Sequence, residues 1–384
     1  MTRPARGLAM VALVEPVSPL ADKKARGPSH GIGISISGGG YRAMLFHLGA
    51  FLRLFELGLL QRSSRISSVS GGSITSAKIA LEWHRLKTRD DFFEHVVTPI
   101  RRLASVTIDA PCIVAGVLLP GRVSDYVAWA YRRFLFGRAT LQDLPKKPEF
   151  LINATNVETG TLWRFTRACM SDYKVGEIRK PELSLASAVA ASSAFPPFLS
   201  PHLLRVRESD FSKVWADDRA LLSDISLTDG GVYDNLGLET VWKAYRHVLV
   251  SNAGAAIEPT PSPASNWAGH SWRVIGIIHG QVTSLRQRQL IASFKAKQEE
   301  RGWRRGAYWG VGSDVSNYHL PDALPAPVER TTELARISTR LARLSDELQE
   351  RLINWGYAIC DTAIRKHFPQ PGMPAPQFPY PRGV

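Results

Sequence analysis

Residues 66–73 have the sequence Ile-Ser-Ser-Val-Ser-Gly-Gly-Ser, which predicts a strand followed directly by a helix. Small and β-branched residues in its first half predict a buried strand, and apolar residues then recur at helical spacing as far as Leu81. Ser70 therefore lies on a sharp turn from strand to helix. Such an elbow strains the backbone of the serine and requires small neighbours, which Ser68 and Gly72 provide.

A helix that begins at Ser70 aims its unpaired amide groups and the positive end of its dipole at an anion forming beside the serine. We therefore interpret Ser70 as a nucleophile, with Gly71 and Gly72 as supports of the elbow. A serine followed by two glycines is also compatible with an ordinary turn. The interpretation depends on partners elsewhere in the chain.

The composition is that of a globular protein with a basic surface. Of the 384 residues, 44% are apolar and 21% are charged, which excludes wholesale disorder. The 48 Lys and Arg against 34 Asp and Glu give a net charge of +14. This charge favours an anionic partner, either a nucleic acid or a phospholipid surface, and by itself does not choose between them.

Cysteine usage and hydropathy predict a cytoplasmic protein. The 3 cysteines lie far apart without metal-ligand spacing, which favours a reducing compartment and no metal site. No apolar run is long enough to cross a bilayer. The short apolar run at residues 8–14 is followed by Glu15 and Pro16 rather than by a small-residue cleavage site, so we do not expect a signal peptide.

A glycine-rich turn lies at residues 37–43, Ser-Gly-Gly-Gly-Tyr-Arg-Ala. It follows an alternating strand pattern at residues 32–36 and precedes a helical apolar stripe that runs to Leu59. Together with the elbow, the order is strand, glycine turn, helix, strand, elbow, helix. This order predicts an α/β sheet whose functional loops lie at the carboxyl ends of its strands.

Three interpretations of the glycine turn compete. It matches a dinucleotide fingerprint, but Ser70 stands where a ribose-binding acid is expected, and no Gly-Lys-Ser/Thr follows for a P-loop. We favour an oxyanion hole. The amides of Gly38, Gly39 and Gly40 can approach a tetrahedral intermediate, and Arg42 adds a positive charge beside it.

An aspartate followed by two glycines supplies a candidate base. Within residues 224–235 a strand pattern runs into Asp229, Gly230 and Gly231. A serine nucleophile needs a proton acceptor, and none of the 10 histidines lies in a recognisable turn motif. In a desolvated cleft beside Ser70, the carboxylate would accept the proton as the oxyanion forms and would later activate water.

The three motifs together resemble those of the patatin-like phospholipase family. They are residues 37–42, 68–72 and 229–231, in the family's order, and the likeness covers about residues 31–240. The segment Ser-Ala-Phe-Pro-Pro at 193–197 also resembles the region before the acid in bacterial members. The resemblance implies a three-layer α/β/α fold with a central, mostly parallel sheet, and a Ser–Asp dyad that cleaves acyl esters of phospholipids or neutral lipids.

By the same resemblance, Ser70 is the nucleophile, Asp229 is the base, and the glycine turn with Arg42 is the oxyanion site. Ser68 replaces the usual first glycine of Gly-x-Ser-x-Gly, and Ser37 stands where many members have aspartate. Neither change removes a reacting group, so we expect activity to survive. We expect no cofactor, an acyl-lipid substrate, peripheral contact with an anionic membrane, and no nucleic-acid partner.

Two alternatives remain open. Ser70, Asp229 and His279 fall in the chain order of an α/β-hydrolase triad. A protein of a different class, a non-catalytic module that binds a membrane or senses a ligand, would keep the same fold without hydrolysis.

Composition divides the chain into an arm, a catalytic domain and a tail. Residues 1–29 predict a loose basic arm, residues 30–367 the catalytic domain, and residues 368–384 a proline-rich, unstructured tail. Residues 84–145 interleave arginines with aromatic residues. This mixture suits a helical insertion that contacts an anionic membrane, and it suits equally a helical insertion packed on the core. Residues 281–367 are expected to be mainly helical.

Short apolar or small-residue runs predict the remaining elements. We expect strands at residues 150–155, 163–166, 248–251 and 274–278, and a helix at residues 185–194. Within the C-terminal part, a helix from Thr332 to Lys366 is expected.

Overall fold

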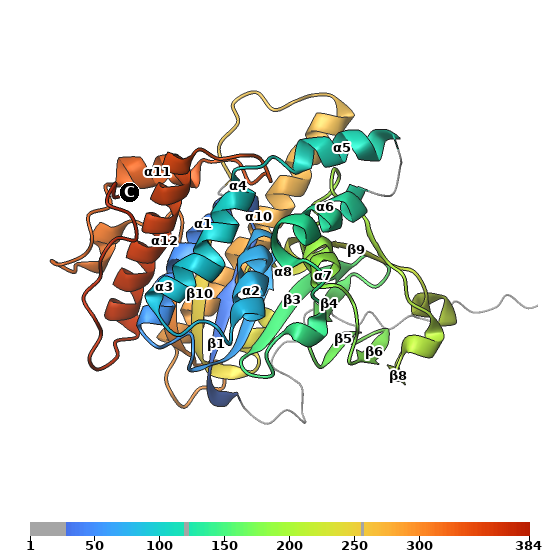
Figure 1. Cartoon of the computed structure of the whole chain (residues 1–384), viewed down its shortest axis with the longest axis horizontal. Helices are drawn as coiled ribbons and strands as arrows, with labels where there is room; N and C mark the ends of the chain where they lie inside the picture. Colours follow the sequence, from blue (N-terminus) through green and yellow to red (C-terminus); the bar gives the residue numbers. More distant parts are fainter. Residues whose placement is uncertain (1–27, 119–122, 255–256) are drawn as a thin grey trace, which may run out of the picture.

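A mixed sheet forms the centre of the molecule, and its central strands are parallel (Figure 1). The computed structural model describes residues 28–118, 123–254 and 257–384. The predicted arm, residues 1–29, therefore lies outside the described residues except for its last two. The parallel strands are hydrogen-bonded in the order β11 (Arg305–Gly310), β10 (Tyr245–Asn252), β1 (Ser29–Ile36), β2 (Ser63–Val69) and β3 (Glu149–Asn156).

Antiparallel strands extend the sheet beyond β3. They follow in the order β4 (Thr161–Phe165), β5 (Cys169–Asp172), β6 (Gly176–Arg179) and β8 (Lys213–Val214). Off this path, β9 (Ile225–Asp229) pairs with both β3 and β7 (His202–Leu204). The strands predicted at residues 150–155 and 248–251 lie within β3 and β10, and β4 overlaps most of the strand predicted at residues 163–166.

The register brings the ends of the functional strands to one edge of the sheet. Ile36, the last residue of β1, pairs with Ser68 of β2 on one side and with Ser251 of β10 on the other. Ala154 of β3 pairs with Asp229, the last residue of β9. The glycine turn and the elbow therefore leave the sheet at the carboxyl ends of its parallel strands, as the rule for α/β sheets predicts, and the antiparallel strand β9 brings the aspartate turn close to them.

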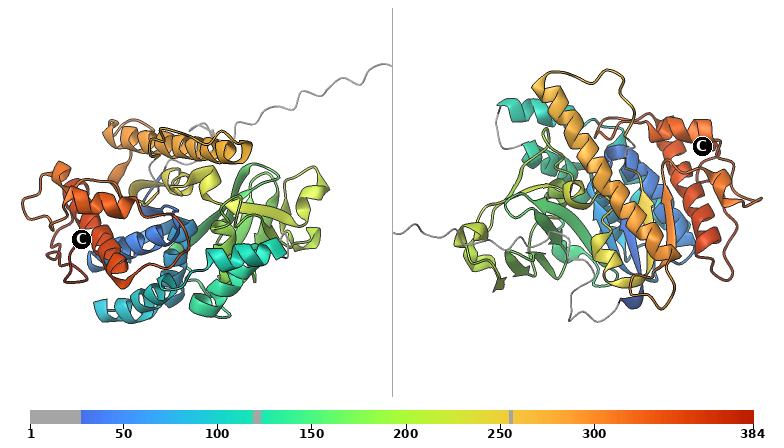
Figure 2. Two further views of the ribbon diagram at one scale, coloured as in Figure 1. Left: turned by 90° about the horizontal axis from the view of Figure 1, so that it is seen from above. Right: turned by 180° about the vertical axis from the view of Figure 1, so that it is seen from behind.

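Helices cover both faces of the sheet and complete the three layers that the family resemblance implied (Figure 2). One face carries α1 (Gly40–Glu56), α2 (Ser70–Glu82) and α12 (Asp346–His367). The other face carries α8 (Gly231–Asp234), α9 (Glu239–Trp242) and α10 (Trp267–Lys295). The predicted small-residue helix is α7 (Leu185–Ser192), and it packs against α2 and β3. A wholly buried ion pair between Arg53 of α1 and Asp361 of α12, 2.7 Å long, ties those two helices together.

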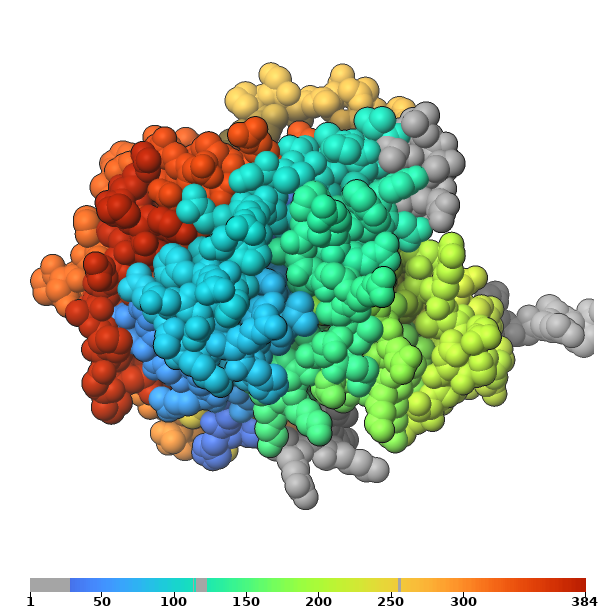
Figure 3. All heavy atoms as spheres, viewed as in Figure 1, coloured from blue at the N-terminus to red at the C-terminus, as the bar shows by residue number. Residues whose placement is uncertain are grey.

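The described part of the segment 84–145 is mainly helical, and many of its apolar residues are buried in the core. Its elements are α3 (Arg89–Phe92), η1 (Phe93–Val97), α4 (Thr98–Ala104), α5 (Asp109–Leu118), α6 (Val123–Tyr131), η2 (Arg132–Phe136) and η3 (Leu141–Asp143). The elements α3, η1, α4 and η2 contact α1 or α2, and the segment forms much of one face of the molecule (Figure 3). Phe92, Ile100, Leu103 and Tyr131 are fully buried, whereas Trp129 is half-exposed. The packing interpretation thus accounts for most of this segment, and membrane contact by its exposed aromatic residues stays a prediction.

The strand predicted at residues 274–278 is wrong, because these residues lie in the middle of α10. The helix begins after Asn266, whose side chain accepts a hydrogen bond from the Gly269 amide at 2.8 Å, and it continues to Lys295. A five-residue apolar run has no periodicity that separates a strand from a helix, so only the flanking cap marked the helix. Within the described ranges, no helix combines the length and the apolar character needed to cross a bilayer.

The C-terminal part contains a strand and an interrupted helix that the sequence did not predict. β11 lies within the stretch expected to be mainly helical. The helix expected from Thr332 to Lys366 is two helices, α11 (Val328–Ala335) and α12, and residues 336–345 join them.

The tail, residues 368–384, has no helix or strand, but it is packed against α12. The Asn354 side chain donates hydrogen bonds to the carbonyls of Tyr380 at 2.9 Å and Gly383 at 2.7 Å, and Val384 is only 1% exposed. The prediction of an unstructured tail is therefore wrong. A high proline content predicts that a segment lacks regular backbone hydrogen bonds. It does not predict whether side chains elsewhere in the chain bind that segment.

Candidate active site

The turn between β2 and α2 has the strained backbone that the elbow interpretation requires. Val69 is extended, with φ −135°, and Ser70 has φ 51°, a left-handed value that is costly for any residue with a Cβ. Strain of about 1–3 kcal/mol of this kind persists only where the surrounding structure enforces it. The Ser70 amide donates a hydrogen bond to the Ser192 hydroxyl at 2.9 Å, which helps to hold this conformation.

Backbone contact between the elbow and the glycine turn explains the two glycines after Ser70. A Cβ on Gly71 would lie 2.1 Å from the Gly40 carbonyl oxygen, and one on Gly72 would lie 2.5 Å from that of Ser37. Any side chain at either position would force the two turns apart. The elbow and the glycine turn are therefore packed directly against each other.

Asp229 ends β9 and lies beside Ser70. Both side chains are buried, at 2% and 8% exposure. One carboxylate oxygen, Oδ1, accepts a hydrogen bond from the Gly231 amide at 2.7 Å, while Oδ2 makes no hydrogen bond of good geometry among the described residues. Burial raises the pKa of Asp229 to about 7, against opposing contributions from the Gly231 amide and the Ser70 hydroxyl. A carboxyl group with this pKa is half ionised at neutral pH, as a general base should be.

The glycine turn approaches Ser70 from the other side. A Cβ on Gly38 would lie 3.0 Å from the Ser70 Cβ, so these two residues are in contact. The Gly38 amide donates a hydrogen bond to the Asn235 carbonyl at 3.1 Å. The Gly39 amide has no hydrogen-bond partner among the residues that the structure describes. It is therefore an available donor close to the elbow, and α1 begins at the next residue, Gly40.

Arg42 lies in the first turn of α1, and its guanidinium group is occupied by backbone carbonyls. It donates hydrogen bonds to Ala335 at 2.6 Å, Ile337 at 2.8 Å and Ala253 at 2.7 Å. Burial lowers the pKa of Arg42 to about 10, so the group stays charged at neutral pH. Its predicted part in the oxyanion site stays a prediction. The contacts themselves support a positioning role, because they attach the start of α1 to two distant segments.

Asp229, Gly230 and Gly231 form a second tight turn. A Cβ on Gly230 would lie 2.4 Å from the Asn153 carbonyl oxygen, and one on Gly231 would lie 2.9 Å from Oδ1 of Asp229. These glycines therefore leave room for the chain to turn around the carboxyl group.

Several polar residues that support this site were not predicted. Ser192 links the Ser70 amide to the Ser73 hydroxyl, to which it is hydrogen-bonded at 2.9 Å. Asn235 fills the space between Gly38 and Gly231. No spacing or motif marks these residues in the sequence, because they come from α7, α2 and the segment after α8 and meet only in the folded chain.

A buried histidine supports the glycine turn from behind. His47 Nδ1 is hydrogen-bonded to the Ser251 hydroxyl at 2.8 Å, and Nε2 to the Ser37 carbonyl at 3.0 Å. Burial lowers the pKa of His47 to about 3, so the ring is neutral at ordinary pH. Ser37, which stands in place of aspartate, accepts a hydrogen bond from the Ala253 amide at 2.7 Å.

His279 of α10 lies next to the aspartate turn but is not joined to the pair. Its Cε1 atom is 3.2 Å from the place of a Cβ on Gly231, and its ring meets Phe195 edge to face. Among the described residues, its ring makes no hydrogen bond to Ser70 or Asp229. The three side chains therefore do not form the hydrogen-bonded series that a triad requires.

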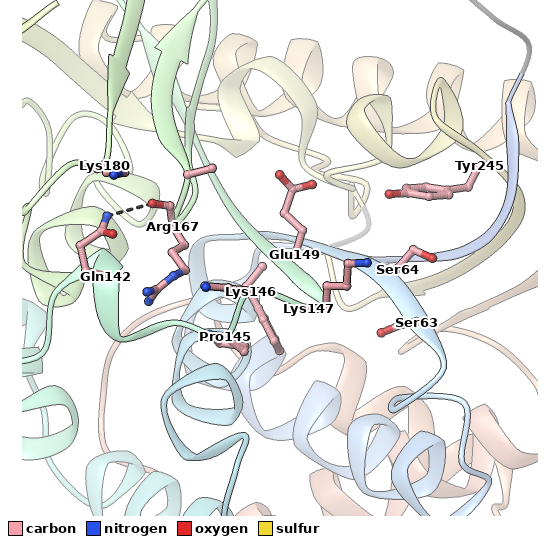
Figure 4. Close-up of a pocket in the computed structure, with 12 residues that line it drawn as sticks. Ser63, Ser64, Gln142, Pro145, Lys146, Lys147, Glu149, Arg167, Lys180 and Tyr245 are labelled. Atoms are coloured by element: carbon pink, nitrogen blue, oxygen red, sulfur yellow. Dashed lines mark hydrogen bonds between the residues drawn. The ribbon is translucent and has the colours of Figure 1, made fainter. Parts of the chain in front are cut away.

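A pocket of about 940 Å³ lies at the opposite edge of the sheet (Figure 4). Its lining includes Ser63 and Glu149, the first residues of β2 and β3, together with Lys146, Lys147 and Arg167. A strand the length of β2 spans about 20 Å, so this pocket is separate from the elbow. None of the predicted site residues lines it.

Comparison with known proteins identifies the family. The model of the family described as patatin-like phospholipase matches residues 34–242, which is more than half of the chain and includes the elbow, the glycine turn and the aspartate turn. The chain belongs to the patatin-like phospholipase family. Membership supports lipid hydrolysis as the type of reaction, at the level of the family.

A solved structure resembles this patatin-like chain in fold. Human GIVD cytosolic phospholipase A2 aligns with a TM-score of 0.55 and 14% identity, covering 88% of this chain and 61% of that one. This chain therefore spans about three fifths of the length of that relative. VipD from Legionella pneumophila aligns with a TM-score of 0.41 and 14% identity, covering 89% of this chain and 68% of that one. No curated protein matches the chain in sequence.

Proposed function

We propose that this patatin-like chain is a lipid acyl hydrolase of phospholipase A type, which cleaves carboxylic esters of membrane phospholipids through an acyl-Ser70 intermediate. Asp229 is the general base. The observation that carries the proposal is a buried carboxyl group with a pKa near 7 beside a serine in a strained elbow. A nucleophile and a base within reach of each other are the minimum for this chemistry.

The reaction would proceed in two steps. As the Ser70 oxygen attacks the ester carbonyl, Asp229 takes the hydroxyl proton, and the tetrahedral oxyanion is stabilised by the Gly39 amide and by the positive end of α2. Collapse of this intermediate releases the alcohol, which takes up the proton from Asp229, and leaves an ester on Ser70. Asp229 then activates a water molecule, which hydrolyses that ester.

Covalent labelling tests the assembled nucleophile. A fluorophosphonate probe is expected to label the wild type and not Ser70→Ala. Ser76→Ala is a matched control, because Ser76 is a buried serine on the same helix whose hydroxyl makes no hydrogen bond among the described residues. Labelling of Ser70→Ala at the wild-type rate, or no labelling of a folded wild type, contradicts the proposal and favours the non-catalytic module.

Product analysis tests the substrate class. Incubation with a mixed lipid extract is expected to release free fatty acids and lysophospholipids, measured by mass spectrometry, with wild type and not with Ser70→Ala. Release of acyl chains from neutral lipids alone would contradict the phospholipid assignment and keep the hydrolase. We also propose that the enzyme works at the surface of an anionic membrane, to which its net charge of +14 is suited.

A further inference from the structure

The first half of α10 exposes an unusual number of large apolar side chains. We define the α10 patch as the exposed residues of this half together with the neighbouring Phe198: Trp267, Trp272, Val274, Ile275, Ile277, Ile278 and Phe198. Trp267 is 84% exposed and Ile278 is 59% exposed. Soluble surfaces carry scattered apolar residues, but a contiguous patch of this kind marks a site of interaction.

The second half of α10 anchors the helix firmly on the sheet. Leu290 is fully buried in a cluster with Trp242, whose ring nitrogen donates a hydrogen bond to the Ser293 hydroxyl at 2.9 Å. Arg286 forms ion pairs with Asp234 at 3.5 Å and Glu239 at 3.0 Å. The patch therefore belongs to a helix that is fixed at its other end, and α10 itself lies along the outer side of the molecule (Figure 2).

The patch adjoins the segment that precedes the aspartate turn. The Trp272 ring meets Phe195 at 6.0 Å and Phe198 at 5.7 Å between ring centroids, and both phenylalanines lie in the segment before the aspartate turn. About two turns further along α10, His279 contacts the same Phe195 and lies beside Gly231. Whatever covers the patch is thus brought next to Asp229.

The charges around the patch suit an anionic surface. Residues 259–298 contain no Asp or Glu and carry five cations, Arg273, Arg286, Arg288, Lys295 and Lys297. Arg286 is neutralised by its ion pairs with Asp234 and Glu239, whereas Arg288 is exposed. A helix with tryptophans and branched aliphatic residues, flanked by cations and free of acids, is suited to the boundary between head groups and acyl chains.

We propose that the α10 patch docks on an anionic phospholipid bilayer and presents the candidate active site to lipids in that surface. The inference rests on the proposed function, since the patch adjoins the site proposed to cleave lipids. It places membrane contact on α10 rather than on the segment 84–145. The occupant is the bilayer surface, into whose head-group region the first half of α10 inserts.

Flotation with vesicles of three parts phosphatidylcholine to one part phosphatidylserine tests the proposal on the full chain. The double variant Ile275→Glu/Ile278→Glu is expected to bind at least about tenfold more weakly than the wild type, because two anions replace two apolar anchors at an anionic surface. Trp215→Glu is the matched control, because Trp215 is 46% exposed in a different region. Equal binding of wild type and double variant overturns the proposal, as does no binding by a folded wild type.

Hydrolysis of a water-soluble ester distinguishes a loss of membrane docking from a loss of catalysis. The double variant is expected to hydrolyse a short-chain water-soluble ester and to react with the fluorophosphonate probe as the wild type does, and to lose hydrolysis of vesicle lipids. Ser70→Ala is expected to bind vesicles normally. Binding by a wild type that neither reacts with the probe nor releases fatty acid supports the docking surface while contradicting the proposed function.

Light scattering tests the other occupants of the patch. The wild type without vesicles is expected to have the same mass as the double variant over a range of concentrations. A wild-type dimer that the double variant abolishes, without any loss of vesicle binding, assigns the patch to a second copy of the chain and overturns the proposal. Dibromo-lipid quenching that is weaker in Trp267→Phe than in the wild type would support insertion directly.

Discussion

The segment 84–145 and the first half of α10 show opposite relations between sequence and structure. In the segment 84–145, arginines and aromatic residues alternate as in an interfacial sequence, yet residues such as Phe92 and Ile100 are fully buried. In α10, residues 274–278 have the composition of a buried strand, yet they are exposed on a helix. Apolar composition therefore predicts that a segment is covered, and only the packing shows whether the protein itself covers it.

The largest expected effect is on the rate of hydrolysis at the candidate site, which both regions adjoin. Tyr131 of α6 interacts electrostatically with Asp229, and its hydroxyl is hydrogen-bonded to that of Ser193 at 3.1 Å, while His279 of α10 lies beside Gly231. Asp229→Asn is expected to lower kcat/KM for a soluble ester by about 10³-fold, because a positioned base is worth about 10²–10⁴. His279→Ala is expected to stay within about threefold of the wild type, since its ring makes no hydrogen bond to the pair.

The reverse result would reassign the base. If His279→Ala abolished hydrolysis while Asp229→Asn kept most of it, the Ser–His–Asp alternative would hold and the Ser–Asp mechanism would be wrong. Near-ultraviolet circular dichroism of both variants is the control for folding.

The second effect is on stability. Phe92→Ala, at a fully buried position within the segment 84–145, is expected to lower the free energy of unfolding by about 3–5 kcal/mol, through lost burial and the cavity left behind. Ile278→Ala, on the exposed side of α10, is expected to change it by no more than about 0.5 kcal/mol. Urea unfolding measures both. Similar losses at the two positions would show that the isolated chain covers the α10 patch.

The third effect is the pH dependence of hydrolysis. Burial raises the pKa of Asp229 to about 7, so the fraction of active carboxylate is expected to rise about tenfold from pH 6 to pH 8. The same rising limb is expected in His279→Ala, measured as kcat/KM for a soluble ester. Loss of the limb in that variant would assign it to the α10 histidine.

The raised pKa of Asp229 also affects stability, which is expected to fall with rising pH while hydrolysis rises. Between about pH 4 and pH 7 the unfolded chain has lost the Asp229 proton while the native chain keeps it, so the native state is expected to lose stability as pH rises through this window. Asp229→Asn should remove this contribution. Urea midpoints of wild type and variant at pH 5 and pH 8 measure the difference, and a wild type whose stability rises relative to Asp229→Asn over this range would contradict it.

The smallest effect is the salt dependence of vesicle binding. Arg288→Gln, in the acid-free region of α10, is expected to weaken binding to anionic vesicles by about fivefold at low salt and by less at high salt, since one cation near such a surface contributes about 1 kcal/mol. Arg133→Gln, in the segment 84–145, is expected to have no effect. Flotation at two ionic strengths compares them. Loss of binding only in Arg133→Gln would return the membrane contact to the segment 84–145.

The sequence alone was sufficient to predict those parts of the candidate site that need a fixed local backbone conformation. The elbow at Ser70 and the two glycine turns were predicted because a strained turn and backbone contact admit few residue types. Ser192, Asn235 and His47 were not predicted, since each acts through a partner that only the folded chain brings near. For Arg42, a place next to the glycine turn was predicted from the sequence, but its hydrogen bonds to three backbone carbonyls were not.

The sequence by itself determined the order of the three motifs, the α/β class and the family, because these depend on residue types at short spacings. The tertiary structure decided that a carboxyl group 159 positions away from Ser70 is buried beside it, that residues 274–278 are helical, and that the tail is packed. Burial, pKa and exposure are properties of surroundings assembled from distant segments. A local pattern has no means of encoding which of its faces those segments will cover.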